Sequence, residues 1–289
     1  MTTMRWMLAA ALATVLAAGS ANAAPPAAIF TDPPADAAHP ARMEVLHIPS
    51  GEVEINGVAY VAAGAGPHPV VVLFHGLPGN EKNLDLAQAI RRAGWTVVTL
   101  NYRGSWGSPG TFSFRGNLDD AKAALAYVRT PAVAAKLDID PKRLVVIGHS
   151  MGGWVTSQTA GADPDVAGAV MISSANMGLT AFAPAEQRLR TARENMEALA
   201  GVTAESMAQE MSTLGPFTFA AAAPGLAKKP LLVLTSDDGL AGMSDALVAD
   251  VRKAGGKVTA VHVATDHGWN SARIRLETEV LNWLAALPK

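Results

Sequence analysis

The stretch LVVIGHSMGG at residues 144–153 decides the fold of this chain. Its first four residues are apolar, as in a buried strand, and a helical pattern begins at Trp154. Gly148 and Gly152 flank Ser150 between them, and glycine permits the tight strand-to-helix turn of a Gly-x-Ser-x-Gly motif. Such a strained turn holds the serine hydroxyl where a substrate carbonyl can reach it.

Strands and helices alternate on both sides of this turn. Continuous apolar runs predict strands that are buried on both faces, and helical patterns lie between them. Such alternation is typical of a mostly parallel sheet with helices on both faces, so the sequence predicts an α/β fold. The apolar runs lie at 69–75, 95–101, 144–147, 166–173, 231–235 and 257–264.

Residues 176–228 interrupt the alternation, because no strand pattern occurs among them. Two amphipathic patterns occur instead, one with Leu189 and Met196 on its apolar face and one with Met207 and Met211. We therefore expect a small helical cap. Its methionines either pack on the domain or line an acyl pocket, since methionine adapts to varied shapes.

Residues 1–23 have the pattern of a signal peptide. Arg5 supplies a positive charge, residues 6–18 form an almost uninterrupted apolar run, and Ala-Asn-Ala at 21–23 matches a cleavage site. The apolar run is shorter than the roughly 20 residues of a membrane-spanning helix. We therefore expect an exported protein, periplasmic or secreted, that begins at Ala24 and keeps no stable membrane anchor after cleavage.

Two further segments follow from composition. Residues 24–42 contain five prolines and many alanines, which predicts an extended, poorly packed spacer. Residues 43–289 then form the domain, with the cap inserted at about 176–228.

The composition of the chain excludes several classes of function. Its 289 residues are 49% hydrophobic and 17% charged with a net charge of −2, and no basic run indicates a nucleic-acid partner. The absence of cysteine excludes disulfides, a thiolate nucleophile and thiolate metal sites. The histidines outside the motifs show no ligand spacing, so we expect no metal and no cofactor. The oligomeric state stays open.

A serine hydroxyl becomes a strong nucleophile only when a base removes its proton and a third group orients that base. His267 follows the last predicted strand, and Asp237 and Asp238 follow the strand at 231–235. Open parallel sheets place their sites at these strand ends. The order Ser150, acid, His267 is that of a hydrolase triad, with either aspartate as the acid.

The run FHGLPG at 74–79 ends another buried strand. A loop in this place supplies one backbone N–H of an oxyanion hole, and the residue after the nucleophile supplies the other. In this chain the two donors are Leu77 and Met151. We expect His75 to hold the loop by a side-chain hydrogen bond. Support for the loop and the elbow comes from Gly76, Gly148, His149 and Gly152.

Together these motifs resemble the α/β-hydrolase superfamily, in its secreted serine esterase and serine peptidase branches, which include dienelactone hydrolases and prolyl-oligopeptidase-type catalytic domains. The resemblance covers about residues 43–288. It implies a mostly parallel sheet of about eight strands and a helical cap after the sixth strand, where 176–228 lies. Members of the family tend to place the acid beside a turn with a small residue such as Gly239, which favours Asp238 over Asp237.

The resemblance implies a serine hydrolase that cleaves carboxylic esters through an acyl-enzyme intermediate. We expect the cap to form a mobile lid over a mainly apolar pocket, with the loop at 106–114 as an aromatic opposite wall. A small-molecule ester is then the substrate, or a short peptide if the protein is a small aminopeptidase or other amide hydrolase. A catalytically silent binding protein is the alternative outside enzymes. A peptidase needs a carboxylate for the free amino terminus, and the candidates in the cap are Glu186, Glu194, Glu197, Glu205 and Glu210.

Overall fold

One sheet of eight strands organises the computed structural model, which describes residues 24–288; the predicted signal peptide at 1–23 lies outside them. The strand order is β1-β2-β4-β3-β5-β6-β7-β8. The pairs β1–β2 and β2–β4 are antiparallel and the other five are parallel, so the predicted sheet is confirmed. The strands are β1 Arg42–Ser50, β2 Val53–Val61, β3 His68–Phe74, β4 Thr96–Leu100, β5 Ile139–His149, β6 Gly168–Ile172, β7 Leu231–Thr235 and β8 Val258–His262.

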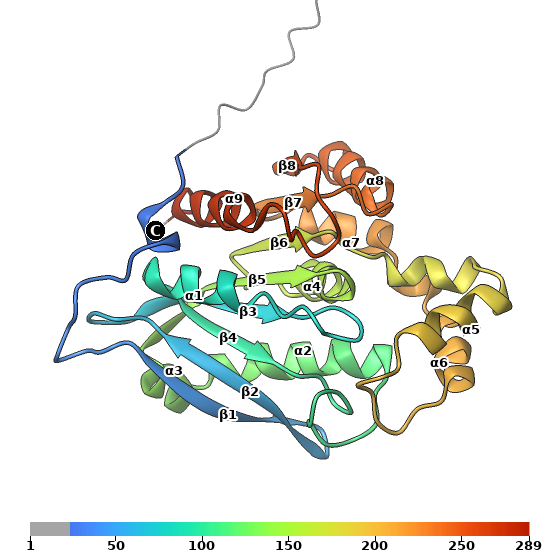
Figure 1. Ribbon diagram of the computed structural model, residues 1–289, viewed down its shortest axis with the longest axis horizontal. Coiled ribbons are helices and arrows are strands. Elements are labelled where there is room, and N and C mark those ends of the chain that lie inside the picture. The colour runs from blue at the N-terminus through green and yellow to red at the C-terminus, as the bar shows by residue number, and fades with distance from the viewer. Residues whose placement is uncertain (1–23, 289) are drawn as a thin grey trace, which may run out of the picture.

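Helices cover both faces of this sheet (Figure 1). α1 and α9 pack on one face, and α2, α4, α7 and α8 pack on the other. The α-helices are α1 Leu84–Arg92, α2 Phe114–Arg129, α3 Pro131–Lys136, α4 Met151–Ala162, α5 Ala185–Glu194, α6 Ala204–Met211, α7 Phe219–Leu226, α8 Ala241–Lys253 and α9 Arg273–Ala285. The 3₁₀ helices are η1 Ala27–Ile29, η2 Met177–Phe182 and η3 Gly215–Phe217.

Strand β3 shows why its sequence reads as an unbroken apolar run. All seven of its residues are buried, because successive side chains enter opposite cores. Val71 and Leu73 pack in the core with α1 and α9, whereas Val70 and Val72 pack in the core with α2 and α4. Because β3 is packed on both faces, its C-terminal end is held in place, and so is the start of the loop that follows it.

The segment expected to form the cap divides into two parts. The helices η2, α5, α6 and η3 project beyond the sheet, whereas α7 packs against α4 and α8 in the layer that covers it (Figure 1). The cap therefore ends before residue 228, near Phe217. Glycines permit the α4–α7 contact, since a Cβ on Gly225 would stand 1.8 Å from the carbonyl oxygen of Gly161.

The methionines of the cap pack on the domain and line no acyl pocket. Met207 and Met211 of α6 are 1% and 0% exposed, and both belong to the core cluster that includes α2 and α4. The sequence leaves open whether these methionines pack on the domain or line an acyl pocket, and in the structure they pack on the domain. The cap and the domain consequently share one hydrophobic core.

The predicted spacer is docked on the domain over part of its length. Ile29 of η1 is 9% exposed and packs in the cluster with α1 and α9, near the C-terminal end of the chain (Figure 1). Arg92 of α1 donates from Nη2 to the carbonyl oxygen of Ile29 at 2.9 Å. Ile29 anchors the segment against α1 and α9, whereas no other residue of 24–42 is buried.

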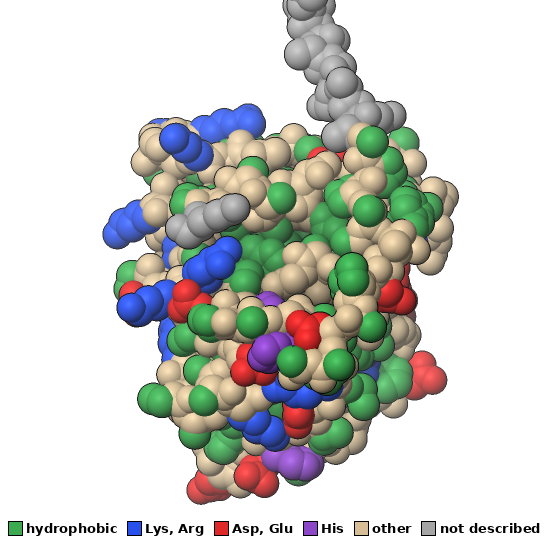
Figure 2. All heavy atoms as spheres, turned by 90° about the vertical axis from the view of Figure 1, so that its left-hand side faces the viewer, with side chains coloured by type: hydrophobic (Ala, Val, Ile, Leu, Met, Phe, Trp, Pro, Cys, Tyr) green, Lys and Arg blue, Asp and Glu red, His purple; other side chains and the backbone are tan. Residues whose placement is uncertain are grey.

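Charges of both signs are interspersed on the face shown in Figure 2, in keeping with the net charge of −2. Within residues 24–288, no helix has both the length and the apolar character needed to cross a membrane.

A buried ion pair ties the loop after β4 to the sheet and to α2. Asp120 of α2 has a fully buried side chain, and the backbone N–H of Arg103 donates to its Oδ2 at 2.7 Å. The Arg103 guanidinium donates to Oδ1 at 2.7 and 2.9 Å, and Ser50 at the end of β1 donates to the same oxygen at 2.6 Å. A carboxylate with this many donors fixes three segments at one point.

We expect Asp120→Ala to cost about 3–5 kcal/mol in the free energy of unfolding, because it leaves the Arg103 charge without its partner. Asp119→Ala is the matched control. Asp119 lies one residue away, is 62% exposed and pairs with Lys122 at 3.6 Å, so its loss should cost less than about 0.5 kcal/mol. Urea unfolding at neutral pH measures both, and equal midpoints for the two variants would contradict the assignment.

Candidate active site

Ser150 sits at a strained turn between β5 and α4. Its φ and ψ are 58° and −123°, a conformation that L-residues rarely adopt. Glycines let the turn close, since a Cβ on Gly148 would stand 2.0 Å from the carbonyl oxygen of Gly152. A Cβ on Gly152 would stand 2.2 Å from the carbonyl oxygen of Phe74. The predicted roles of both glycines thus have a steric basis: no other residue fits in these positions.

His267 and Asp238, the predicted base and acid, form a hydrogen-bonded pair. His267 Nδ1 donates to Asp238 Oδ2 at 2.7 Å, from the loop after β8 to the loop after β7. The Asp238 side chain is 3% exposed and that of His267 is 42% exposed. Burial raises the pKa of Asp238, but the hydrogen bonds from His267 and from the Leu240 backbone lower it further, so the net pKa lies below its ordinary value. The bond to Nδ1 leaves Nε2 of His267 to act on Ser150.

Asp237 belongs to a different pair. Its Oδ1 accepts a hydrogen bond from His262 Nε2 at 3.0 Å, and the two side chains are 62% and 50% exposed. His262 Nδ1 in turn accepts from the Thr235 hydroxyl at 3.0 Å. The structure therefore separates the two aspartates that the sequence leaves as alternatives, and it is Asp238 that contacts His267.

Ser150 and His267 line one small cavity of about 200 Å³, together with His149 and the loop at 76–81. No hydrogen bond joins the Ser150 hydroxyl to His267 within residues 24–288. Such bonds are often long before substrate binds and tighten in the reacting complex. Ser150 and His267 thus border the same cavity, and Asp238 is joined to it through its hydrogen bond with His267.

The backbone N–H groups expected to form the oxyanion hole are without hydrogen-bond partners among the described residues: that of Leu77, which lines the cavity, and that of Met151, which follows Ser150. Leu77 follows β3, and Met151 is the first residue of α4. Gly76 allows the loop to approach, because a Cβ there would stand 2.9 Å from the Cβ of Ser150. Donors without partners at a helix start and in an adjacent loop can bind a developing oxyanion.

His75 holds the oxyanion loop in the way the sequence predicts. Its Nδ1 donates to the carbonyl oxygen of Gly76 at 2.8 Å, and its ring packs against Tyr102 at a tilt of 57°, with centroids 4.6 Å apart. Burial lowers the pKa of His75 to about 4, so the ring is neutral at pH 7.

His149 contacts His267 directly. Its Nε2 donates to the backbone carbonyl oxygen of His267 at 2.8 Å, and the two rings lie 4.7 Å apart. Burial, and next the proximity of His267, lower the pKa of His149 to about 4. The residue expected to support the elbow therefore anchors the loop that carries His267, as a neutral ring.

Two expectations about the pocket are wrong. No residue of 176–228 lines the cavity at Ser150, so the cap does not form a lid over it, although more of its lining is apolar than polar. In the loop at 106–114, Phe112 and Phe114 are buried in the core, and only Trp106 is exposed, at 40%. Phe112 and Phe114 face inward, where their rings pack edge to face with centroids 5.3 Å apart.

Sequence reasoning also missed functional neighbours of the triad. Asn80 and Glu81 line the cavity, and Asn80 also borders a larger pocket of about 760 Å³ with Trp106 and Glu197. In the sequence, only their position just after the FHGLPG run indicates that Asn80 and Glu81 lie near the site. The sequence around Trp106 gives no sign that it borders the larger pocket.

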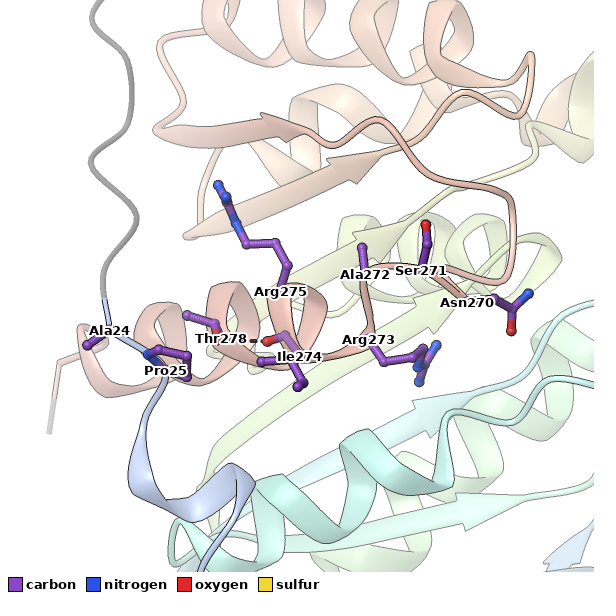
Figure 3. A pocket seen from close by; sticks show the side chains of 9 residues that line it. All are labelled: Ala24, Pro25, Asn270, Ser271, Ala272, Arg273, Ile274, Arg275 and Thr278. Atoms are coloured by element: carbon purple, nitrogen blue, oxygen red, sulfur yellow. Dashed lines mark hydrogen bonds between the residues drawn. The ribbon is translucent and has the colours of Figure 1, made fainter.

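A further groove of about 590 Å³ lies between Ala24–Pro25 and the start of α9 (Figure 3). Arg273 and Arg275 point in different directions there, and Thr278 bonds the carbonyl oxygen of Ile274 within the helix. The groove contains none of the triad. Across residues 24–288, no group of three or more His, Asp or Glu side chains is placed to hold a metal ion.

With this geometry in place, comparison with known proteins assigns the family. The model of the Alpha/beta hydrolase family matches residues 71–275, well over half of the chain. The chain belongs to the alpha/beta hydrolase family. An uncharacterized protein of Mycobacterium tuberculosis (strain H37Rv) is 29% identical over 124 residues, which cover 43% of this chain and 42% of the relative. The chain thus matches less than half the length of its curated relatives.

Solved structures of alpha/beta hydrolases match over most of the chain. An acylaminoacyl peptidase of Pyrococcus horikoshii superposes with a TM-score of 0.64 at 16% identity, covering 85% of this chain and 41% of that one. The carboxylesterase EstE1, cloned from a metagenomic library, superposes with a TM-score of 0.63 at 23% identity, covering 86% and 88%. At these identities the similarity shows the fold, and ester and peptide hydrolases both share it. The family and these neighbours support a hydrolase.

For this hydrolase, we expect Asp238→Asn to lower kcat by about 10⁴-fold, because an amide at this position favours the wrong tautomer of His267. Asp237→Asn is the matched control, since Asp237 contacts His262 instead. Steady-state kinetics on a p-nitrophenyl ester compares the two. A larger loss in the Asp237 variant would transfer the role of acid to that residue.

The buried neutral histidines make stability depend on pH. A folded-state pKa of about 4 lies below the ordinary value of 6.5, so the unfolded chain binds more protons between the two values. Stability is therefore full above pH 6.5 and falls as the pH drops toward 4, by about 2 kcal/mol per histidine at pH 5. Urea unfolding at pH 7.5 and pH 5 measures the difference.

His149→Gln should remove about half of this pH-dependent loss, whatever its cost at pH 7.5. His47→Gln is the control, because His47 is exposed on β1 and should leave the difference between the two pH values as it is. A His149→Gln variant with the full wild-type difference would contradict the prediction.

Proposed function

We propose that this protein is a serine hydrolase that cleaves small carboxylic esters through Ser150, His267 and Asp238. The observation that carries the proposal is the 2.7 Å bond between His267 Nδ1 and Asp238, at a cavity that Ser150 shares with His267. The N–H groups of Leu77 and Met151 have no partners among the described residues, so they are free to stabilise the negative charge of an oxyanion.

In the proposed reaction, Ser150 Oγ attacks the ester carbonyl carbon while Nε2 of His267 takes its proton. The N–H groups of Leu77 and Met151 bind the oxyanion of the tetrahedral intermediate. His267 then returns the proton to the departing alcohol, which leaves an acyl group on Ser150. Water attacks this acyl-enzyme, again with His267 as the base, and the acid product leaves as the serine regains its proton.

The volume of the cavity favours a short acyl group. At about 200 Å³ it is smaller than the roughly 300–1,000 Å³ of sites for drug-sized ligands. Its lining is more apolar than polar, but this volume leaves little room for added methylenes. The larger pocket beyond Asn80 offers room for the alcohol part of the substrate.

Amide hydrolysis is the second candidate, because one cap glutamate lies at the larger pocket. Glu197 lines that pocket, where it could bind a free amino terminus. Glu210 is engaged elsewhere, since it accepts from the backbone N–H groups of Phe114 and Arg115 at 3.0 Å each. Glu205 pairs with Arg193 at 3.7 Å.

A substrate panel tests the proposal. We expect p-nitrophenyl acetate and butyrate to be turned over faster than the octanoate, and all three faster than alanyl p-nitroanilide. Ser150→Ala should lower kcat by on the order of 10⁴- to 10⁶-fold and abolish labelling by a fluorophosphonate. An active Ser150→Ala variant would falsify the mechanism.

The same panel separates the second candidate. If the anilide is the better substrate, the amide reading replaces the ester reading, and Glu197→Gln should then raise KM for the anilide while leaving KM for the neutral esters unchanged.

A further inference from the structure

Trp106 bonds the oxyanion loop from outside the catalytic cavity. Its Nε1 donates to the carbonyl oxygen of Pro78 at 2.6 Å, one residue beyond Leu77. Trp106 itself does not line the cavity that contains Ser150. We propose that Trp106 is a positioning residue that sets the oxyanion loop against Ser150, an inference that rests on the proposed function of that loop.

Two aromatic rings hold this loop. Gly79 packs against both, since a Cβ there would stand 2.4 Å from His75 Nδ1 and 2.9 Å from Trp106 Nε1. His75 binds the carbonyl oxygen of Gly76 at the start of the loop, and Trp106 binds that of Pro78. Because the Leu77 N–H lies between these two bonds, the loss of either one frees the donor to move.

Trp106 is itself held in place by its backbone and by its ring. Its φ of 49° is unfavourable for a bulky residue and persists only where surrounding contacts impose it. Asn101 Nδ2 donates to the Trp106 carbonyl oxygen at 3.1 Å, and the Trp106 N–H donates to the carbonyl oxygen of Ala198 at 3.3 Å. Lys82 Nζ stands 4.6 Å from the ring centroid and bonds Asn101 Oδ1 at 2.9 Å.

The cap contributes to this arrangement through its backbone. Ala200 donates to the carbonyl oxygen of Gly104 at 2.7 Å and accepts from the N–H of Phe112 at 3.0 Å. Backbone hydrogen bonds therefore join the segment around Ala198 to the loop around Trp106. The hydrogen bond from the Trp106 indole to Pro78 then connects both segments to the oxyanion loop. The cap thus acts on catalysis through the oxyanion loop, although none of its residues lines the cavity.

Trp106→Phe tests the inference, because it keeps a ring and removes the N–H donor. Trp154→Phe is the matched control, since Trp154 is fully buried and donates to the carbonyl oxygen of Phe217 at the same 2.6 Å, away from the oxyanion loop. Three quantities are compared: kcat and KM for p-nitrophenyl acetate, the Ki of a trifluoromethyl ketone, and hydrogen exchange of a peptide that spans residues 76–81. The ketone forms an oxyanion adduct with the serine, so its affinity reports on the oxyanion hole itself.

In Trp106→Phe we expect kcat to fall by roughly 10- to 100-fold with KM unchanged, below the loss of about 10²–10³-fold that follows removal of an oxyanion donor. Ki for the ketone should rise by a similar factor, and residues 76–81 should exchange faster. Trp154→Phe should change none of the three, even if both variants lose equal stability.

Unchanged exchange of residues 76–81 in Trp106→Phe overturns the inference, whatever happens to kcat. Equal losses of kcat and ketone affinity in both variants also overturn it, since they indicate a general structural effect. If the wild-type protein fails to react with a fluorophosphonate, the proposed function fails instead, and the exchange data still decide whether Trp106 restrains the loop.

Discussion

The contact between the elbow and the end of β3 is the constraint on which the rest of the site depends. Gly152 presses against the Phe74 carbonyl from one side, and Gly76 presses against Ser150 from the other. With no side chain between the two backbones, a strained serine and the N–H of Leu77 are brought to one place. The sheet makes this possible, because β3 and β5 are adjacent parallel strands whose carboxyl ends meet at the same edge.

The two buried histidines around this contact carry no charge at pH 7. Burial lowers the pKa of His75 and of His149 to about 4. Asp238 faces His267 as a buried carboxylate. In the proposed reaction, the imidazolium formed on His267 therefore lies against the Asp238 carboxylate and the neutral ring of His149, an arrangement that stabilises the charged state.

Much of the fold and the triad could be predicted from the sequence, because both depend on local pattern. Apolar runs mark β3 and β5, and the motif around Ser150 together with the chain order identifies His267. The choice between Asp237 and Asp238 depends on where β8 places His262, which no local pattern gives. The place of Trp106 and the distance of the cap from the cavity were missed for the same reason: they arise from contacts between segments far apart in the chain.

The burial of Met207 and Met211 has a consequence for how such a protein can change over evolution. These side chains fill a core that also contains Met151, Trp154 and the apolar face of α2. The inserted helices therefore have no interior of their own and are not a module that can be traded between relatives. Exchange of the cap between two relatives would leave cavities in the shared core where side chains no longer fit, and would expose apolar surface that the original cap covers. In a chain built this way, new specificities arise by substitution in short surface loops, while the inserted helices and the domain beneath them are inherited as one unit.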